Sequence, residues 1–161
     1  MRWITRERPK IDRVACPWLI ALFIDQEAEF LFVPPPEVAA RARETGAVPY
    51  DVEGVELSHE GERCSFDAFL AKYNLSDPAL AELATIVRGA DTARLDLAPQ
   101  CAGLLAISLG LSQLFADDHE QLKHGFVVYD ALYAWLTKAR GETHTWNPQR
   151  QPQPAATKAA G

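Results

Sequence analysis

Cysteine is scarce in this chain, with only Cys16, Cys64 and Cys101 spread over 161 residues. An odd number of widely spaced cysteines is not the framework of a disulfide-stabilised secreted domain, so we expect free thiols in a reducing compartment. The N-terminus has no apolar run of the kind that a signal peptide requires, and no apolar stretch is long enough to span a membrane. The sequence therefore predicts a cytoplasmic protein without a membrane segment.

Positive charge is also in short supply. Lys and Arg number 16 against 22 Asp and Glu, which gives a net charge of −6, and basic residues such as Arg41 and Arg43 are interleaved with acidic ones. Binding to nucleic acid needs a clustered excess of positive charge, so we do not expect this chain alone to bind nucleic acid. The expected partner is a small oxyanion or a metal ion, and the sequence leaves self-association open.

Several familiar motifs are missing as well. The chain has no phosphate-binding loop, nucleophile elbow or dinucleotide fingerprint, and no C-x-x-C or H-x-x-x-H metal pair. Its length and its 48% of hydrophobic residues fit one globular domain. We place that domain at residues 1–141 and expect a flexible tail at 142–161, where Pro, Gln, Ala, Thr and Lys dominate and hydrophobic residues nearly vanish.

The N-terminal half alternates between strand and helix patterns. Strands are expected at 3–5, 29–33 and 48–52. One helix is expected to begin with Asp12 as its N-cap, and another to span 36–44. Pro17 implies either that the first helix starts near Cys16 or that its first turn is distorted. The β-α-β-α-β order predicts an α/β fold with a small parallel sheet.

The C-terminal half is expected to be helical and to pack on or beside that sheet. Helices are predicted at 65–73, 77–89, 99–115 and 117–139, with Ser65, Asp77 and Asp117 as N-caps. The last helix carries an apolar stripe. We expect Gly89 to turn the chain after a helix, and the glycines within 99–115 to allow close helix packing. The stripe residues are Leu122, Phe126, Tyr129, Tyr133 and Leu136.

Reactive side chains are most concentrated between Ser58 and Asp67, at the entrance of an expected helix. A helix N-terminus stabilises anions and lowers the pKa of a thiol. We therefore expect an accessible, reactive Cys64, helped by Arg63 and opposed by Glu62; the alternative is an inert core cysteine. His59 is a candidate ligand for a divalent metal ion.

Further metal ligands would have to come from other segments. Asp91, His119 and Glu120 are the candidates, and the alternative for the last helix is a solvated Glu120–His124 pair. An oxyanion site could use Arg13, Arg63, Cys64 and Arg88. Arg13 lies in a β-to-α connection, where α/β sheets bind ligands, although an ion pair with an aspartate explains it equally well.

Several ordered blocks resemble the chromate-resistance protein family, the ChrB-type C-terminal domain. They lie in residues 10–20, 23–25, 29–33, 56–61, 64–67, 86–91, 125–126 and 128–133. The resemblance covers about residues 2–140 and implies a role in bacterial chromate resistance. Longer members join this domain to an N-terminal regulatory region, in which case the domain is thought to help sense chromate. No such region precedes it here, so we do not expect transcriptional regulation by this chain.

We therefore expect a domain that binds or senses an oxyanion or a divalent metal. The competing hypothesis is a metal-dependent hydrolytic or redox enzyme, in which His59, Asp91 and His119 hold the metal and Glu60 or Glu120 acts as general base. An interaction module that needs a partner protein is a third possibility.

Overall fold

The computed structural model describes residues 1–146. The tail expected at 142–161 lies outside the described residues except for 142–146, which are exposed and form no helix or strand. No helix within the described part of the chain is both long enough and apolar enough to cross a bilayer.

The N-terminal half forms a three-stranded parallel sheet in the order β2-β1-β3, as its alternating pattern predicts. The strands are β1 (Arg2–Arg6), β2 (Glu29–Val33) and β3 (Val48–Pro49), and Trp3 of β1 pairs with Phe30 and with Val48. β3 is shorter than expected because Asp51, with a φ of 50°, turns the chain away from the sheet.

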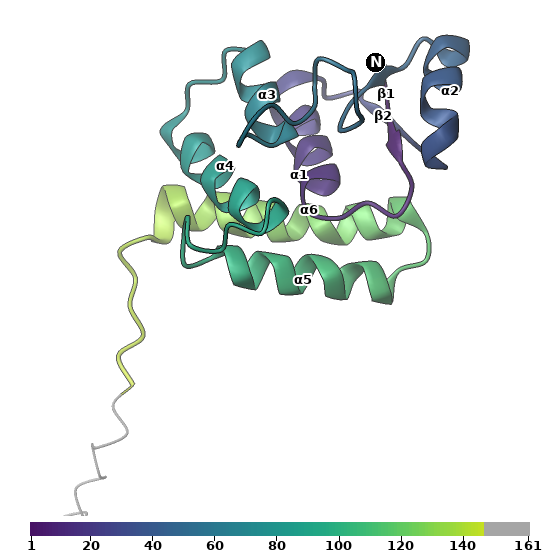
Figure 1. Cartoon of the computed structure of the whole chain (residues 1–161). Coiled ribbons are helices and arrows are strands. Elements are labelled where there is room, and N and C mark those ends of the chain that lie inside the picture. The colour runs from purple at the N-terminus through teal and green to yellow at the C-terminus, as the bar shows by residue number, and fades with distance from the viewer. Residues whose placement is uncertain (147–161) are drawn as a thin grey trace, which may run out of the picture.

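The two faces of the sheet pack in different clusters. Trp3 lies in the main core together with residues of α1 (Asp12–Leu19), whereas Ile4 faces the opposite way and packs with Val38 of α2 (Val38–Thr45) in a smaller cluster. α2 follows a 3-10 turn at Pro35–Glu37 and ends at Gly46, whose φ of 67° is left-handed. In Figure 1, α2 therefore lies apart from the other helices, across the sheet.

The strand order creates a crevice at one edge of the sheet. The chain leaves β1 to form β2 on one side, and returns later to form β3 on the other side of β1. Ligands of open α/β sheets bind at such a switch point, outside the carboxyl ends of the strands. Here the segments that follow β1 and β3 meet at that place.

Pro17 lies inside α1, so the expectation that the helix starts near Cys16 is wrong. The helix begins at Asp12, with Ile11 rather than Asp12 in the N-cap position, and it continues after Leu19 as a π-helix over Ile20–Ile24. Ile11 has a φ of 38°, an unfavourable value for a β-branched residue, directly before the first turn.

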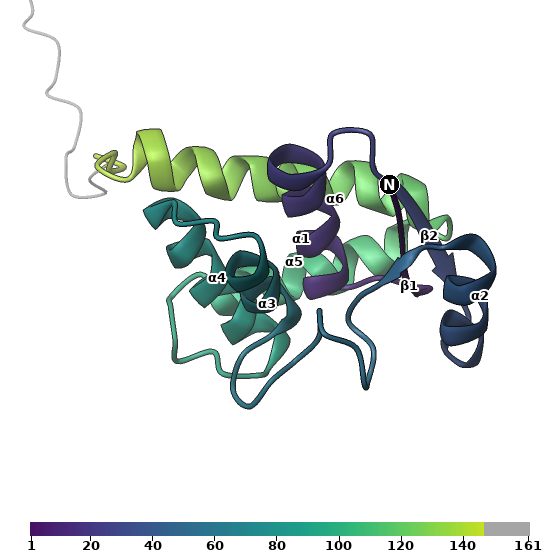
Figure 2. The ribbon, with the colours of Figure 1, turned by 90° about the horizontal axis from the view of Figure 1, so that it is seen from above.

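Four helices form the C-terminal half: α3 (Ser65–Lys72), α4 (Pro78–Asp91), α5 (Cys101–Leu114) and α6 (Asp118–Ala134), which continues as a π-helix over Trp135–Ala139. α3, α4 and α6 pack against α1, beside the sheet, whereas α5 packs on α4 and runs antiparallel to α6 (Figures 1 and 2). The expected stripe of α6 faces the core, where Leu122 and Tyr129 are buried.

Two of the three helix caps expected in the C-terminal half are confirmed. The Asp77 carboxylate accepts a hydrogen bond from the backbone N–H of Ala79, and Asp117 accepts one from Glu120. The N-cap of α3 is Cys64 and not Ser65.

The glycines behave differently from the expectation. Gly89 lies within α4, where a Cβ atom would come within 2.3 Å of the Cys101 sulfur, so it permits close packing instead of a turn. A Cβ atom added to Gly125 of α6 would similarly lie 2.4 Å from the Cγ1 atom of Val14 in α1. Gly103 and Gly110, predicted to allow close packing, have open space around them.

Candidate functional site

Three carboxylates surround one imidazole nitrogen in the crevice. The Nε2 atom of His59 lies 3.1 Å from Asp91, 3.3 Å from Asp51 and 3.5 Å from Asp12. A single N–H cannot donate fully to three oxygens at once, so the carboxylates offer more acceptors than the imidazole can satisfy. The side chains of Asp12, Asp51, Asp91 and His59 form the acidic cluster.

Four different segments supply the acidic cluster. Asp12 opens α1 shortly after β1, Asp51 follows β3, Asp91 is the last residue of α4, and His59 lies in the loop before α3. The loop is closed by a 2.8 Å bond from the Asp51 N–H to the carbonyl of Leu57, whose side chain is buried. The cluster is thus held by the backbone and by the core.

The carboxylate of Asp12 stabilises the start of a helix far away in sequence. Its two oxygens accept hydrogen bonds from the N–H groups of Ser65 at 2.7 Å and Phe66 at 3.1 Å, in the first turn of α3. The thiol of Cys16 donates to the same carboxylate at 3.1 Å. Although Asp12 is only 1% exposed, its charge is therefore well solvated by protein groups.

Asp51 connects the acidic cluster to two arginines. It accepts hydrogen bonds from Arg6 at 2.8 Å and from the Ser65 hydroxyl at 2.9 Å, and the Nε atom of Arg13 lies 3.4 Å away. Arg13 also donates to the carbonyls of Arg6 and Glu7. The ion-pair alternative for Arg13 is therefore the arrangement present, and burial lowers its pKa.

Negative charge is crowded in this cluster, and the pKa values respond. Hydrogen bonding to Asp12, reinforced by the neighbouring carboxylates, raises the pKa of His59 to about 9. Burial, followed by the charges of Asp12 and Asp51, raises the pKa of Asp91 to about 7. Burial also raises the pKa of Asp51. Each shift favours bound protons, because additional positive charge relieves the repulsion among the carboxylates.

The donor set fits a metal ion. Asp12, His59 and Asp91 each offer one ligand atom, and these atoms all lie within 4.8 Å of one another. Carboxylate oxygen together with imidazole nitrogen suits divalent ions such as Mn²⁺ and Zn²⁺.

The hydroxyl of the fully buried Tyr50 has no hydrogen-bond partner among residues 1–146. Its pKa is raised by burial and by the nearby charges of Cys16, Asp51 and Asp12.

The structure brings together only part of the predicted metal set. His59 and Asp91 meet, but His119 packs edge-on against Phe32 of β2, and Glu120 pairs with Lys123 on the surface of α6. Asp12 and Asp51 lie beside His59 instead of these two residues. The sequence offered a usable signal for both, because each is an acidic residue shortly after a strand of a parallel sheet.

Cys64 is not the accessible thiol that the sequence suggested. Its side chain is fully buried, and burial, followed by the charges of Asp12 and Asp67, raises its pKa. The expected activation fails because the Asp12 carboxylate already occupies the start of α3. A helix N-terminus next to a bound carboxylate no longer favours a second negative charge.

The two remaining predicted arginines, Arg63 and Arg88, line a separate cavity of about 870 Å³. Arg94, Glu60 and Glu62 also line it. Arg88 is bound to Asp67 of α3 at 2.8 Å. Arg13 and Cys64 are not among the lining residues, so the predicted oxyanion set does not form one site.

Fold and cluster together define a small α/β domain with a carboxylate–imidazole centre at the switch point of a parallel sheet. The chain belongs to the family described as ChrB, C-terminal domain, which it matches over residues 3–136. It is similar to Protein ChrB of Cupriavidus metallidurans, with 32% identity over 140 residues, covering 86% of this chain and 42% of that relative. The chain thus spans less than half of the relative's length. No solved structure matches it.

Proposed function

We propose that this chain serves chromate resistance as a domain that binds a divalent metal ion through Asp12, His59 and Asp91. The observation that carries the proposal is the approach of their ligand atoms to within 4.8 Å of one another. Membership of the ChrB C-terminal domain family supports the biological setting.

The electrostatics of the acidic cluster favour a cation over an anion at this position. Asp51 pairs with the guanidinium groups of Arg6 and Arg13, so a proton on His59 is left to balance the two carboxylates of Asp12 and Asp91. A divalent ion would replace that proton between Asp12, His59 and Asp91. A tetrahedral dianion here would meet three negative side chains instead.

Metal binding can be measured directly. We expect protein stripped with EDTA and dialysed to bind one Mn²⁺ or Zn²⁺ ion by isothermal titration calorimetry. Because they remove a proposed ligand, His59→Ala and Asp91→Asn should weaken binding by about 100-fold or more.

A matched control separates this site from general surface charge. Asp96 is an exposed aspartate paired with Arg94 at 3.0 Å and lies outside the acidic cluster, so Asp96→Asn should bind the ion as the wild type does. Equal affinities in the wild type and all three variants, each folded by circular dichroism, would show that the acidic cluster is not the metal site.

One observation favours a second ligand, a tetrahedral oxyanion, in the neighbouring arginine-lined cavity. Arg88 and Arg94 are paired with aspartates, whereas Arg63 has no ion-pair partner within residues 1–146. A guanidinium group can bind a dianion through two parallel hydrogen bonds. Arg63 is therefore available to recognise chromate.

Sulfate and chromate titrations test the second ligand. Sulfate has the same shape and charge as chromate but does not oxidise thiols, so it reports binding alone. Arg63→Gln should weaken the binding of both anions about tenfold, while Arg41→Gln, on the exposed side of α2, should not. Wild-type protein that binds neither anion would rule out this candidate.

A further inference from the structure

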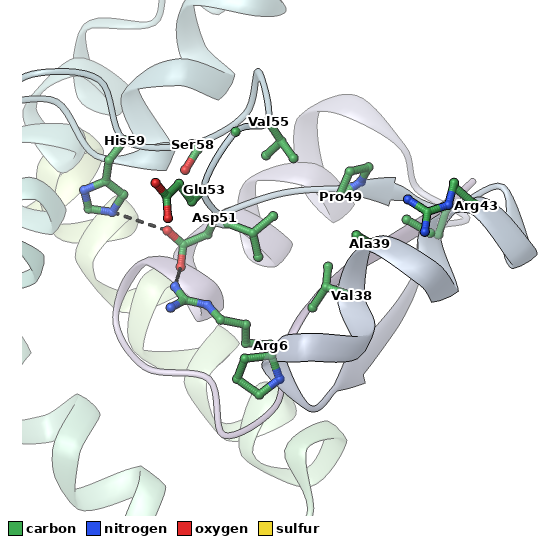
Figure 3. A pocket seen from close by; sticks show the side chains of 15 residues that line it. Arg6, Val38, Ala39, Arg43, Pro49, Asp51, Glu53, Val55, Ser58 and His59 are labelled. Carbon is green, nitrogen blue, oxygen red and sulfur yellow. Dashed lines mark hydrogen bonds and ion pairs between the residues drawn. The ribbon is translucent and has the colours of Figure 1, made fainter.

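A second cavity opens on the acidic cluster from the side of α2. It has a volume of about 1000 Å³ and lies between α2 and the loop at residues 51–58. Its middle is apolar, as Figure 3 shows, and the side chains there come from the helix, the strand end and the loop. These apolar residues are Val38, Ala39, Ala42, Pro49, Val52 and Val55.

Polar groups stand at both ends of this groove. Asp51 and His59, 3.3 Å apart, lie at one end beside Arg6, and Arg43 of α2 lies at the other end with its guanidinium turned toward the groove (Figure 3). Asp51 and His59 therefore belong both to the groove and to the acidic cluster. Volume, apolar lining and a few convergent polar groups are the usual features of a small-molecule site.

The two arginines indicate the charge of the occupant. Arg43 has no ion-pair partner among residues 1–146, and the Nε atom of Arg6 is buried there without a hydrogen-bond partner. Glu53 also lines the groove, and both Glu53 and Arg43 are exposed. A ligand with an apolar body and a negative end would cover the apolar middle and pair with Arg43.

We propose that this groove binds a small organic acid: its apolar body lies between Val38 and Val55, its carboxylate meets Arg43, and its opposite end lies beside Asp51 and His59. The inference rests on the proposed function only in placing that opposite end next to the bound metal ion. It gives the domain an organic ligand in addition to an inorganic one.

The compound 2-naphthoate is a suitable probe, because it combines a flat apolar body with one carboxylate. Titration by calorimetry in EDTA measures the groove without any metal. We expect the uncharged analogue 2-naphthamide to bind about five- to tenfold more weakly, since it lacks the charge-assisted hydrogen bond to Arg43.

Two variants locate the probe. Arg43→Gln should weaken 2-naphthoate binding by the same five- to tenfold and remove the preference over 2-naphthamide. Ala39→Trp, at an exposed position of α2 that lines the groove, should abolish binding of both compounds by filling the space. Arg41→Gln changes an arginine of the same helix that is paired with Glu44 and does not line the groove, so it should leave binding unchanged.

The outcomes are distinct from those of the metal experiment. Binding that survives Ala39→Trp, or a wild type that does not prefer 2-naphthoate over 2-naphthamide, would overturn the groove proposal, whatever the metal titrations give. Loss of metal binding in Asp91→Asn with 2-naphthoate binding retained in EDTA supports both proposals at once, because Asp91 does not line the groove.

Discussion

At the scale of single residues, Asp12 carries the most connections in the crevice. Its carboxylate accepts two backbone hydrogen bonds from the start of α3 and one from the Cys16 thiol, and it contacts His59. Removing it would leave buried donors without a partner, although relief of repulsion with Asp51 offsets part of that loss. We predict that Asp12→Ala lowers the free energy of unfolding by about 3 kcal/mol.

The comparison for this prediction is an ordinary N-cap. Asp117 accepts one exposed hydrogen bond at the start of α6, so Asp117→Ala should cost only about 1 kcal/mol. Urea unfolding of both variants in EDTA, followed by circular dichroism, gives the two values. An Asp12→Ala cost no larger than that of Asp117→Ala would mean that the Asp12 carboxylate contributes little to folding.

Asp12 also shows how far sequence reasoning reached at this scale. The sequence predicted it as the N-cap of its own helix, but Ile11 holds that position, and the Asp12 carboxylate instead accepts hydrogen bonds at the start of α3, where Ser65 lies 53 residues away in sequence. Local patterns cannot specify such a partner. The same limit explains Cys64, whose position at a helix start was correctly predicted while its burial and the competing carboxylate were not.

At the scale of helices, two glycines with the same helix propensity should respond oppositely to substitution. Gly125→Ala places a methyl group against Val14 and should destabilise the protein by about 1–3 kcal/mol through overpacking of α6 on α1. Gly103→Ala, with open space around it, should stabilise by about 0.5–1 kcal/mol.

Thermal unfolding measured by calorimetry distinguishes the two effects. The double variant Gly125→Ala, Val14→Ala should recover part of the loss, because the smaller side chain makes room for the new methyl group. If Gly125→Ala proved as harmless as Gly103→Ala, the contact between α1 and α6 would be looser than described.

Most helices and strands were predictable because their signals are local. The apolar stripe of α6, the Asp77–Pro78 start of α4 and the apolar run of β2 all correspond to elements of the structure. The failures involve contacts between elements. The sequence predicts a helix end at Gly89, but Cys101 of α5 packs against this glycine. No pattern within residues 77–89 indicates that contact.

At the scale of the whole molecule, the acidic cluster exists only because the strand order brings distant segments to one crevice. The β-α-β-α-β order was predictable, yet it did not specify that β1 would be the central strand. The central position of β1 places Asp12 and Asp51 on neighbouring carboxyl ends, while α4 supplies Asp91. The site could therefore be predicted in its general place, at His59 and Asp91, but not in its full composition.

The crowded charge of this cluster also sets the response of the whole protein to pH. Folding raises the pKa of Asp91 from 3.8 to about 7 and that of His59 from 6.5 to about 9. A raised pKa means that the folded state binds protons more tightly than the unfolded chain. Each group therefore contributes stability that is fully present below its unfolded pKa and is lost as the pH rises through its folded value.

We predict that the stability of the metal-free protein falls from these two groups across pH 4–7 for Asp91 and across pH 6.5–9 for His59. Urea unfolding in EDTA at a series of pH values measures this loss. Asp91→Asn should flatten the lower part of the profile and His59→Gln the upper part, whereas Asp96→Asn should reproduce the wild-type curve.

Added Mn²⁺ should stabilise the wild type increasingly as the pH rises, because the ion takes the place of the protons that the cluster loses. A stabilisation by Mn²⁺ that stayed constant between pH 5 and 8 would mean that the ion binds elsewhere, since only a site that exchanges protons for metal couples the two.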